Sequence, residues 1–171
     1  MRTLVTGGVR SGKSAHAESL LSGAPAVSYI APGPVQDDED WAARIAAHRA
    51  RRPAHWTTIE ETDLPAAVAR SSGALIIDCL GTWATAQLDE LGVWERHDWL
   101  ESFAVRLDRA VEAIGTYDDD VVLVTNEVGL GVVPEHRSGR VFRDALGVVN
   151  QRFAAACDDV ALVVAGRVLM L

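Results

Sequence analysis

Short apolar runs alternate along the chain with longer amphipathic segments. The runs show little polar alternation, which is typical of strands buried on both faces of a parallel sheet. The longer segments repeat apolar residues at the spacing of a helix that covers such a sheet. This order predicts one three-layer α/β domain over residues 1–171, with a mostly parallel sheet and helices on both faces. The predicted strands are 3–6, 27–30, 56–59, 74–77, 121–125 and 160–164, and the predicted helices are 15–21, 37–52, 64–70, 83–91, 94–115 and 136–157, with a short end at 168–171.

A glycine-rich turn joins the first predicted strand to the first predicted helix. Its sequence, Gly7-Gly8-Val9-Arg10-Ser11-Gly12-Lys13-Ser14, has the P-loop pattern, for which a chance turn is the alternative. Gly7 and Gly12 permit backbone angles that a Cβ would block, so that successive N–H groups can surround phosphate oxygens. The helix N-terminus adds positive charge, Lys13 supplies a cation to the outer phosphates, and Ser14 offers a hydroxyl to Mg²⁺. The pattern predicts binding of a nucleoside triphosphate.

Further candidate residues follow the other predicted strands. In an open parallel sheet the carboxyl ends of the strands line the ligand crevice. Asp78 ends the apolar run 74–77, and we expect it to hold Mg²⁺ directly or through water. The alternative is that it caps the next helix. The turn at Ala31-Pro32-Gly33 is a candidate for the nucleotide pocket and equally a plain surface loop.

The predicted helix at 37–52 begins with acidic residues and ends with basic ones, as the helix dipole favours. Pro53 forces it to end. His48 lies near this end, among Arg44, Arg49, Arg51 and Arg52. Periodicity alone favours a solvated basic helix end with a surface histidine, and the alternative is a positively charged site for a nucleotide.

Polar and basic residues follow the predicted strand 121–125. Asn126 and Glu127 come at its carboxyl end, where they could orient a substrate hydroxyl or a Mg²⁺-bound water, or form a satisfied loop network. The next predicted helix carries three arginines about one turn apart, which form either a second anion-binding face or solvated charge. These arginines are Arg137, Arg140 and Arg143.

Composition narrows the possible partners. The chain has 171 residues, is 49% hydrophobic and carries a net charge of −8, which argues against nucleic acid or an anionic membrane as the main partner. Cys79 and Cys157 lie in apolar surroundings and lack metal-type spacing, which favours buried free thiols in a reducing compartment. There is no leader-like segment and no apolar run long enough to span a bilayer, so we expect a cytoplasmic protein without membrane insertion.

Several blocks of the sequence resemble one enzyme family over nearly the full chain. They are the P-loop block 6–14, the segment 51–56, the block 123–135 and the segments 142–144 and 149–152. The pattern Asn-Glu-Val-Gly-x-Gly-x-x-Pro-Glu at 126–135 is far more specific than the P-loop. Together these blocks resemble the bifunctional adenosylcobinamide kinase/adenosylcobinamide-phosphate guanylyltransferases of cobalamin biosynthesis.

The resemblance implies a P-loop fold of the RecA-like type and a homotrimer. It also implies a corrinoid substrate, since these enzymes phosphorylate the aminopropanol hydroxyl of adenosylcobinamide with ATP or GTP. They then transfer GMP from GTP to that phosphate through a guanylylated histidine. GTP, ATP and Mg²⁺ are therefore the expected cofactors.

His48 matches the family's guanylylated histidine, with His55 as a rival in the same matched region. A neutral imidazole can attack the α-phosphorus, and nearby arginines would disfavour the imidazolium and neutralise phosphate charge. The catalytic residues are then His48 and Lys13, and the Mg²⁺ ligands are Ser14 and Asp78. The nucleotide-binding residues implied are Gly7, Gly8, Val9, Arg10, Ser11, Gly12, Lys13, Ser14, Ala31, Pro32, Gly33, Arg49, Ala50, Arg51, Arg52, Glu60 and Asp78.

Two other functions are compatible with a P-loop. A kinase of another small alcohol would transfer the γ-phosphoryl group but form no covalent nucleotide. A non-catalytic GTP-binding switch would turn over slowly and change its association with a partner. The switch is the weakest hypothesis, because it needs neither the basic end of the His48 helix nor the Asn126-Glu127 loop.

Overall fold

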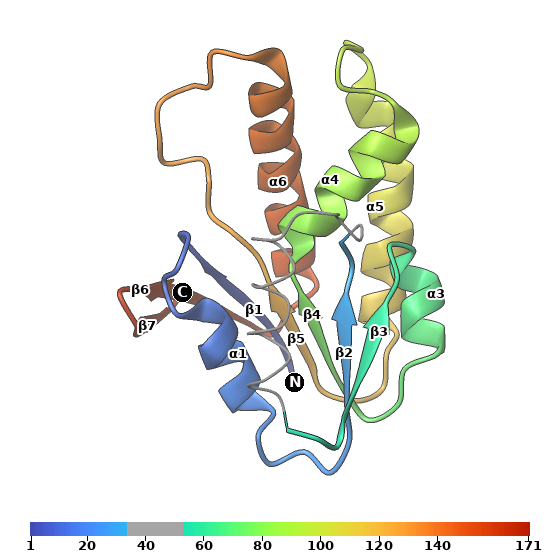
Figure 1. Ribbon diagram of the computed structural model, residues 1–171, viewed down its shortest axis with the longest axis vertical. Coiled ribbons are helices and arrows are strands. Elements are labelled where there is room, and N and C mark those ends of the chain that lie inside the picture. Colours follow the sequence, from blue (N-terminus) through green and yellow to red (C-terminus); the bar gives the residue numbers. More distant parts are fainter. Residues whose placement is uncertain (34–52) are drawn as a thin grey trace.

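The computed structural model describes residues 1–33 and 53–171, and these form one mixed sheet with helices on both faces (Figure 1). In this part of the chain the strand order is β3-β2-β4-β5-β1-β6-β7. Strands β1 to β6 pair in parallel and β7 pairs antiparallel to β6, which confirms the predicted fold class. The strands are β1 (Arg2–Gly7), β2 (Val27–Ala31), β3 (Trp56–Glu60), β4 (Ala74–Asp78), β5 (Val121–Val124), β6 (Asp159–Val164) and β7 (Arg167–Met170). The helices are α1 (Lys13–Leu20), α3 (Leu64–Ala69), α4 (Leu80–Leu91), α5 (Trp99–Gly115) and α6 (Arg137–Ala155).

Two apolar layers enclose the sheet, because successive strand side chains point to opposite faces. On one face, sheet residues such as Leu75 and Ile77 pack with α3, α4, α5 and α6. At the centre of that layer, the ring of Trp83 contacts the rings of Phe103 and Phe153. On the other face, sheet residues such as Ile76 pack with the apolar side of α1. The central strands are apolar on both sides, as their uninterrupted apolar sequences predicted.

Two boundaries differ from the sequence expectation. Helix α5 begins at Trp99 rather than at Trp94, because the preceding residues form a turn in which Arg96 pairs with Asp98 at 2.7 Å. The guanidinium of Arg137 binds the Trp94 and Arg96 carbonyl oxygens of this turn. At the end of the chain, the predicted short end forms strand β7 after a tight turn. The helix predicted at 37–52 lies outside the described residues.

Within the described residues, no helix is both long enough and apolar enough to cross a membrane.

Candidate nucleotide-binding site

The P-loop lies between the end of β1 and the start of α1, as predicted. Its first glycine is packed against the neighbouring strand, because Gly7 lies opposite Val163 in the β1–β6 ladder. A Cβ on Gly7 would lie 2.4 Å from the Val163 carbonyl oxygen and 2.7 Å from the Ser11 hydroxyl. Gly12 caps α1 with a left-handed φ of 97°, which a side chain would strain. These two glycines therefore have the steric roles that the sequence assigned to them.

The polar atoms of the loop point inward. Lys13 is 9% exposed, and its Nζ donates to the Gly8 carbonyl oxygen at 3.1 Å. The Ser11 hydroxyl is buried and has no hydrogen-bond partner in the part of the chain that the structure describes. Arg10 has a left-handed φ of 55°, which is uncommon for a residue with a side chain. A strained backbone with an unpaired buried donor fits a phosphate group, whose oxygens would accept from that hydroxyl.

Asp78 ends β4 at the same edge of the sheet, with β5 between β4 and β1. The hydroxyl of Tyr29 donates to its Oδ2 at 2.8 Å. Tyr29 is 1% exposed, and its ring packs against Trp56, so the hydroxyl has a fixed position. This contact holds the Asp78 carboxylate at the end of β4. Burial raises the pKa of the adjacent Cys79 thiol, which therefore stays neutral.

Two more predicted nucleotide contacts come from the ends of β2 and β3. Ala31 and Glu60 lie opposite each other in the last pair of that ladder. Pro32 is buried and Gly33 is half-buried just beyond β2. The sheet therefore brings the P-loop, the 31–33 turn, Glu60 and Asp78 to a single edge, while their roles in binding stay predictions.

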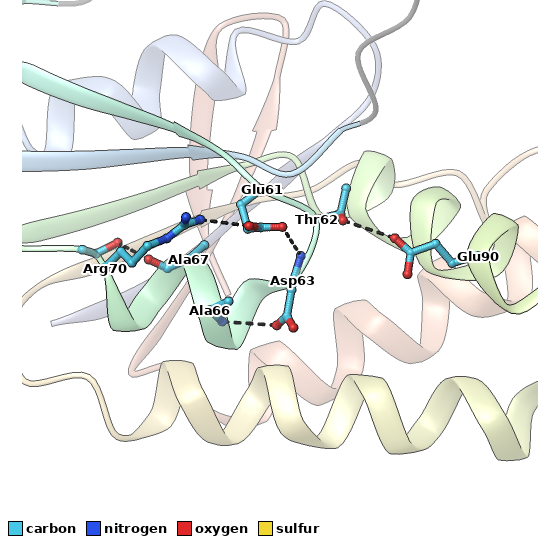
Figure 2. Close-up of polar contacts among 8 residues, drawn as sticks. Glu61, Thr62, Asp63, Ala66, Ala67, Arg70 and Glu90 are labelled. Atoms are coloured by element: carbon cyan, nitrogen blue, oxygen red, sulfur yellow. Dashed lines mark hydrogen bonds and ion pairs between the residues drawn. The ribbon is translucent and has the colours of Figure 1, made fainter.

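The junction after Glu60 is held by polar contacts, which Figure 2 shows. Glu61 binds the guanidinium of Arg70 at 2.9 Å and accepts from the Asp63 backbone N–H. Asp63 caps α3 by accepting from the Ala66 N–H at 3.2 Å. The Thr62 hydroxyl donates to Glu90 of α4 at 3.2 Å. These contacts fix the direction in which the chain leaves β3, so the last strand residue, Glu60, keeps its place at the edge of the sheet.

The basic cluster around the predicted nucleophile lies outside the described residues. This applies to His48, Arg49, Ala50, Arg51 and Arg52, which stay predictions. The rival, His55, is exposed just before β3.

The residues after β5 are fixed by a hydrogen-bonded clamp. Thr125 is fully buried, and its hydroxyl donates to the Asn150 side chain of α6 at 2.6 Å. The amide of Asn150 donates in turn to the Asn126 carbonyl oxygen at 3.0 Å. The Glu127 N–H donates to the Gly7 carbonyl oxygen at 3.2 Å. The strand end that carries Asn126 therefore lies between Asp78 and the P-loop and is tied to the latter.

The three arginines of α6 do not share one role. Arg137 donates to the carbonyl oxygens of the turn before α5, and Arg140 donates to the Pro134 carbonyl oxygen at 3.0 Å. The Nε of Arg143 forms an ion pair with the Oδ1 of Asp144, the next residue, at 3.5 Å. Two of the three guanidinium groups thus hold backbone segments. These contacts with carbonyl oxygens give Arg137 and Arg140 a structural role that neither alternative had included, and the anion-binding face stays one of the two alternatives.

Sequence reasoning missed Tyr29 and Asn150. Tyr29 was counted only as part of a strand, although it lies two residues before the strand end and on the face that Asp78 shares. Asn150 is a polar residue beside the buried positions Val149 and Phe153 of α6, and that interruption of an apolar face was the available signal. Val163 could not be linked to Gly7 without knowing that β6 lies beside β1.

The arrangement of strand ends around a P-loop defines a nucleotide-binding fold, and comparison with known proteins defines the family. A family model described as cobinamide kinase / cobinamide phosphate guanyltransferase matches residues 3–171. The chain belongs to this family. Among its relatives is the bifunctional adenosylcobalamin biosynthesis protein CobU of Salmonella typhimurium, which is 45% identical over 97% of both chains. The similarly named proteins of Escherichia coli (CobU, 97% of both chains) and Pseudomonas aeruginosa (CobP, 97% of this chain and 94% of the relative) are 42% identical.

Solved structures support the fold at much lower identity. An ATPase of the type III secretion system superposes with a TM-score of 0.57 at 12% identity over 94% of this chain, which spans 50% of that ATPase. The assembled ATPase EscN of enteropathogenic E. coli gives the same TM-score at 11% identity over 96% of this chain and 43% of its own. These likenesses show the P-loop NTPase fold alone, whereas the family match indicates the enzyme class, a transferase.

Proposed function

We propose that this chain phosphorylates the aminopropanol hydroxyl of adenosylcobinamide and then transfers GMP from GTP to the new phosphate. The observation that carries the proposal is the family match over residues 3–171. The P-loop of this chain also has the glycines that its close packing requires, since a Cβ on Gly7 would clash with the neighbouring strand. The product would be adenosylcobinamide-GDP, and pyrophosphate would leave in the second step. ATP or GTP serves as the donor in the first step.

In the kinase step, the substrate oxygen attacks the γ-phosphorus, loses its proton, and the nucleoside diphosphate leaves. Lys13 exchanges its contact with the Gly8 carbonyl oxygen for the outer phosphates, where its charge stabilises the transition state. The N–H groups at the start of α1 hold the phosphates in place. Ser14 and Asp78 are the residues that would hold Mg²⁺, which would neutralise negative charge on the phosphates when bound.

In the transferase step, a neutral imidazole nitrogen of His48 attacks the α-phosphorus, and the bond to the pyrophosphate leaving group breaks. A phosphate oxygen of adenosylcobinamide phosphate then attacks the same phosphorus, and the P–N bond breaks to regenerate the histidine. The positively charged side chains of Arg49, Arg51 and Arg52, which are close to His48 in the sequence, would neutralise the negative charge of the phosphates. This assignment is supported by the sequence match alone, because His48 lies outside the described residues.

We also propose a homotrimer located in the cytoplasm. Exposed aliphatic side chains on the last strand pair favour contact between copies of the chain. They are Val164, Val168, Leu169 and Met170, between 42% and 59% exposed. Light scattering of the purified protein measures the mass and tests the trimer directly.

The decisive experiment detects the covalent nucleotide. The protein is incubated with Mg²⁺ and GTP labelled on the α-phosphate, denatured, and examined for retained label, alongside His48→Ala and His55→Ala. We expect an acid-labile, base-stable label that only His48→Ala abolishes. Loss only in His55→Ala would move the nucleophile to that residue.

The alternatives give different results in the same preparation. If the protein retains no label from GTP but still transfers the γ-phosphate to an alcohol, it is a kinase without a covalent nucleotide intermediate. A protein that binds GTP, transfers neither group and changes its association with a partner would be a switch.

A further inference from the structure

The most family-specific block of the sequence, residues 126–135, contacts the P-loop only through its first residues, since the Glu127 N–H donates to the Gly7 carbonyl oxygen. It forms the loop between β5 and α6, which contains three large aliphatic side chains within four residues. Leu130 is 91% exposed, Val132 is 96% exposed and Val133 is 58% exposed. Most large aliphatic side chains of the sheet and helices are buried, so a cluster of this kind marks a surface that contacts something. We refer to residues 129–133 as the apolar tip.

Hydrogen bonds hold the loop on both sides of the apolar tip. On the β5 side, the Glu127 N–H donates to the Gly7 carbonyl oxygen and the Asn150 amide donates to the Asn126 carbonyl oxygen. On the α6 side, Arg140 donates to the Pro134 carbonyl oxygen at 3.0 Å. The Glu127 carboxylate also accepts from the Gly129 N–H at 2.6 Å, which orders the first turn of the loop. The exposed side chains therefore project from a loop whose two ends have fixed positions.

The apolar tip continues from the phosphate-binding end of the molecule. β5 lies beside β1, and the hydrogen bond from Glu127 joins the base of the loop to the first glycine of the P-loop. Figure 1 shows this loop rising from the end of the sheet where β1 meets α1. An acceptor whose hydroxyl is to reach the terminal phosphate must approach that same end.

The size of the patch fits a small molecule better than a second protein. Three aliphatic side chains at these exposures present roughly 400 Å², within the range of a functional surface patch. A standard protein–protein interface buries about 800 Å² on each partner. A corrinoid is a wide macrocycle edged by methyl groups and amide arms, and it needs an open apolar surface because it is too broad for a narrow pocket.

We propose that the apolar tip is the docking surface for the corrinoid acceptor, with Leu130 and Val132 in contact with the edge of the macrocycle. This inference rests on the proposed kinase and guanylyltransferase activity. The fixed loop base then sets the distance between the docked macrocycle and the P-loop. The same surface serves both steps, because the corrinoid stays the same while its hydroxyl becomes a phosphate.

The test is steady-state kinetics with adenosylcobinamide for the first step and adenosylcobinamide phosphate for the second, using the double variant Leu130→Ser/Val132→Ser. We expect KM for the corrinoid to rise about tenfold or more in both steps, because two aliphatic contacts are lost. KM for the nucleotide and the mass measured by light scattering should not change. Val105→Ser is the matched control, since Val105 is 63% exposed on α5 and should leave both constants unchanged.

Three results would overturn the inference. One is an unchanged corrinoid KM in the double variant, and another is an equal change in Val105→Ser. The third is a loss of oligomer mass in the double variant, which would make the apolar tip a contact between copies of the chain. Failure of the proposed function is distinguishable, because the wild-type protein would then not phosphorylate adenosylcobinamide at all.

Discussion

Replacing Gly7 by alanine tests the packing of the P-loop against β6. The added Cβ would lie 2.4 Å from the Val163 carbonyl oxygen, whereas real Cβ contacts stay beyond 3.0 Å. Backbone atoms surround the position on that side, so β1 and β6 must separate by more than about half an ångström at this pair. Gly8→Ala is the matched control, because a Cβ on Gly8 meets nothing within 4 Å.

The expected cost has two parts. Overpacking a close-packed site costs about 1–3 kcal/mol, and weakening one or two ladder hydrogen bonds adds about 1 kcal/mol each. We therefore expect Gly7→Ala to lower the free energy of unfolding by about 2–5 kcal/mol, out of a total of about 5–15 kcal/mol for a domain. Gly8→Ala should change it by less than about 1 kcal/mol.

Urea unfolding followed by circular dichroism measures both variants, and titration with a fluorescent GTP analogue reports the phosphate site. Gly7→Ala should be less stable and should bind the analogue more weakly even at temperatures where it is fully folded. If Gly7→Ala matched Gly8→Ala in both measurements, the close contact between Gly7 and Val163 would be refuted.

Three further predictions follow from contacts of single side chains. Tyr29→Phe removes the hydroxyl that holds Asp78 at 2.8 Å, and should raise the Mg²⁺ concentration for half-maximal GTP binding about tenfold. Tyr117→Phe is the control, because it removes a hydrogen bond of 2.7 Å from a tyrosine hydroxyl to the Gly73 carbonyl oxygen, away from the site, and should leave the Mg²⁺ dependence unchanged. If both variants changed the Mg²⁺ dependence equally, the role of Tyr29 would be contradicted. Asn150→Ala leaves a buried hydroxyl unpaired and should lower the free energy of unfolding by about 1–3 kcal/mol in urea, and an unchanged midpoint would argue against the clamp. Burial raises the pKa of the Cys157 thiol from 9.0 to about 11, so its alkylation in the folded protein, followed by mass spectrometry, should stay slow at pH 8 and accelerate toward pH 11. Because this pKa is higher in the folded than in the unfolded chain, the protonated thiol contributes stability below about pH 9 that is lost as the pH rises toward 11. Fast alkylation at pH 8 would contradict the burial of this thiol.

The sheet and its functional edge could be predicted from sequence because parallel strands impose a simple rule. The central strands are apolar on both faces, so their sequences are recognisable as uninterrupted runs. Once they are parallel, the residues at their carboxyl ends must meet at one edge. This is why Asp78 and the 31–33 turn were expected near the nucleotide before the strand order was known, whereas Gly7 was expected there from the P-loop pattern and Glu60 from the family resemblance.

What could not be predicted depends on which strands and helices are neighbours. The bond from Tyr29 to Asp78 needs β2 beside β4, and the clamp at Asn150 needs α6 beneath the end of β5. Strand β7 has few residues, and only pairing with β6 gives it regular structure. The late start of α5 is set by contacts of Arg137, which lies about forty residues further along the chain. Local periodicity holds no information on contacts of this range.

The position of β1 in the sheet has a consequence for biosynthesis of the protein. Strand β1 pairs with β5 and β6, which follow it much later along the chain, at residues 121–124 and 159–164. Such pairs have a high contact order, and their loop-closure entropy is unfavourable until both strands are present. The Val163 carbonyl that packs against Gly7 lies near the end of β6, and the Gly166 N–H that binds the Ser11 carbonyl comes later still. A nascent chain therefore carries its P-loop sequence long before it gains a finished phosphate site, because that site requires synthesis to have passed Gly166.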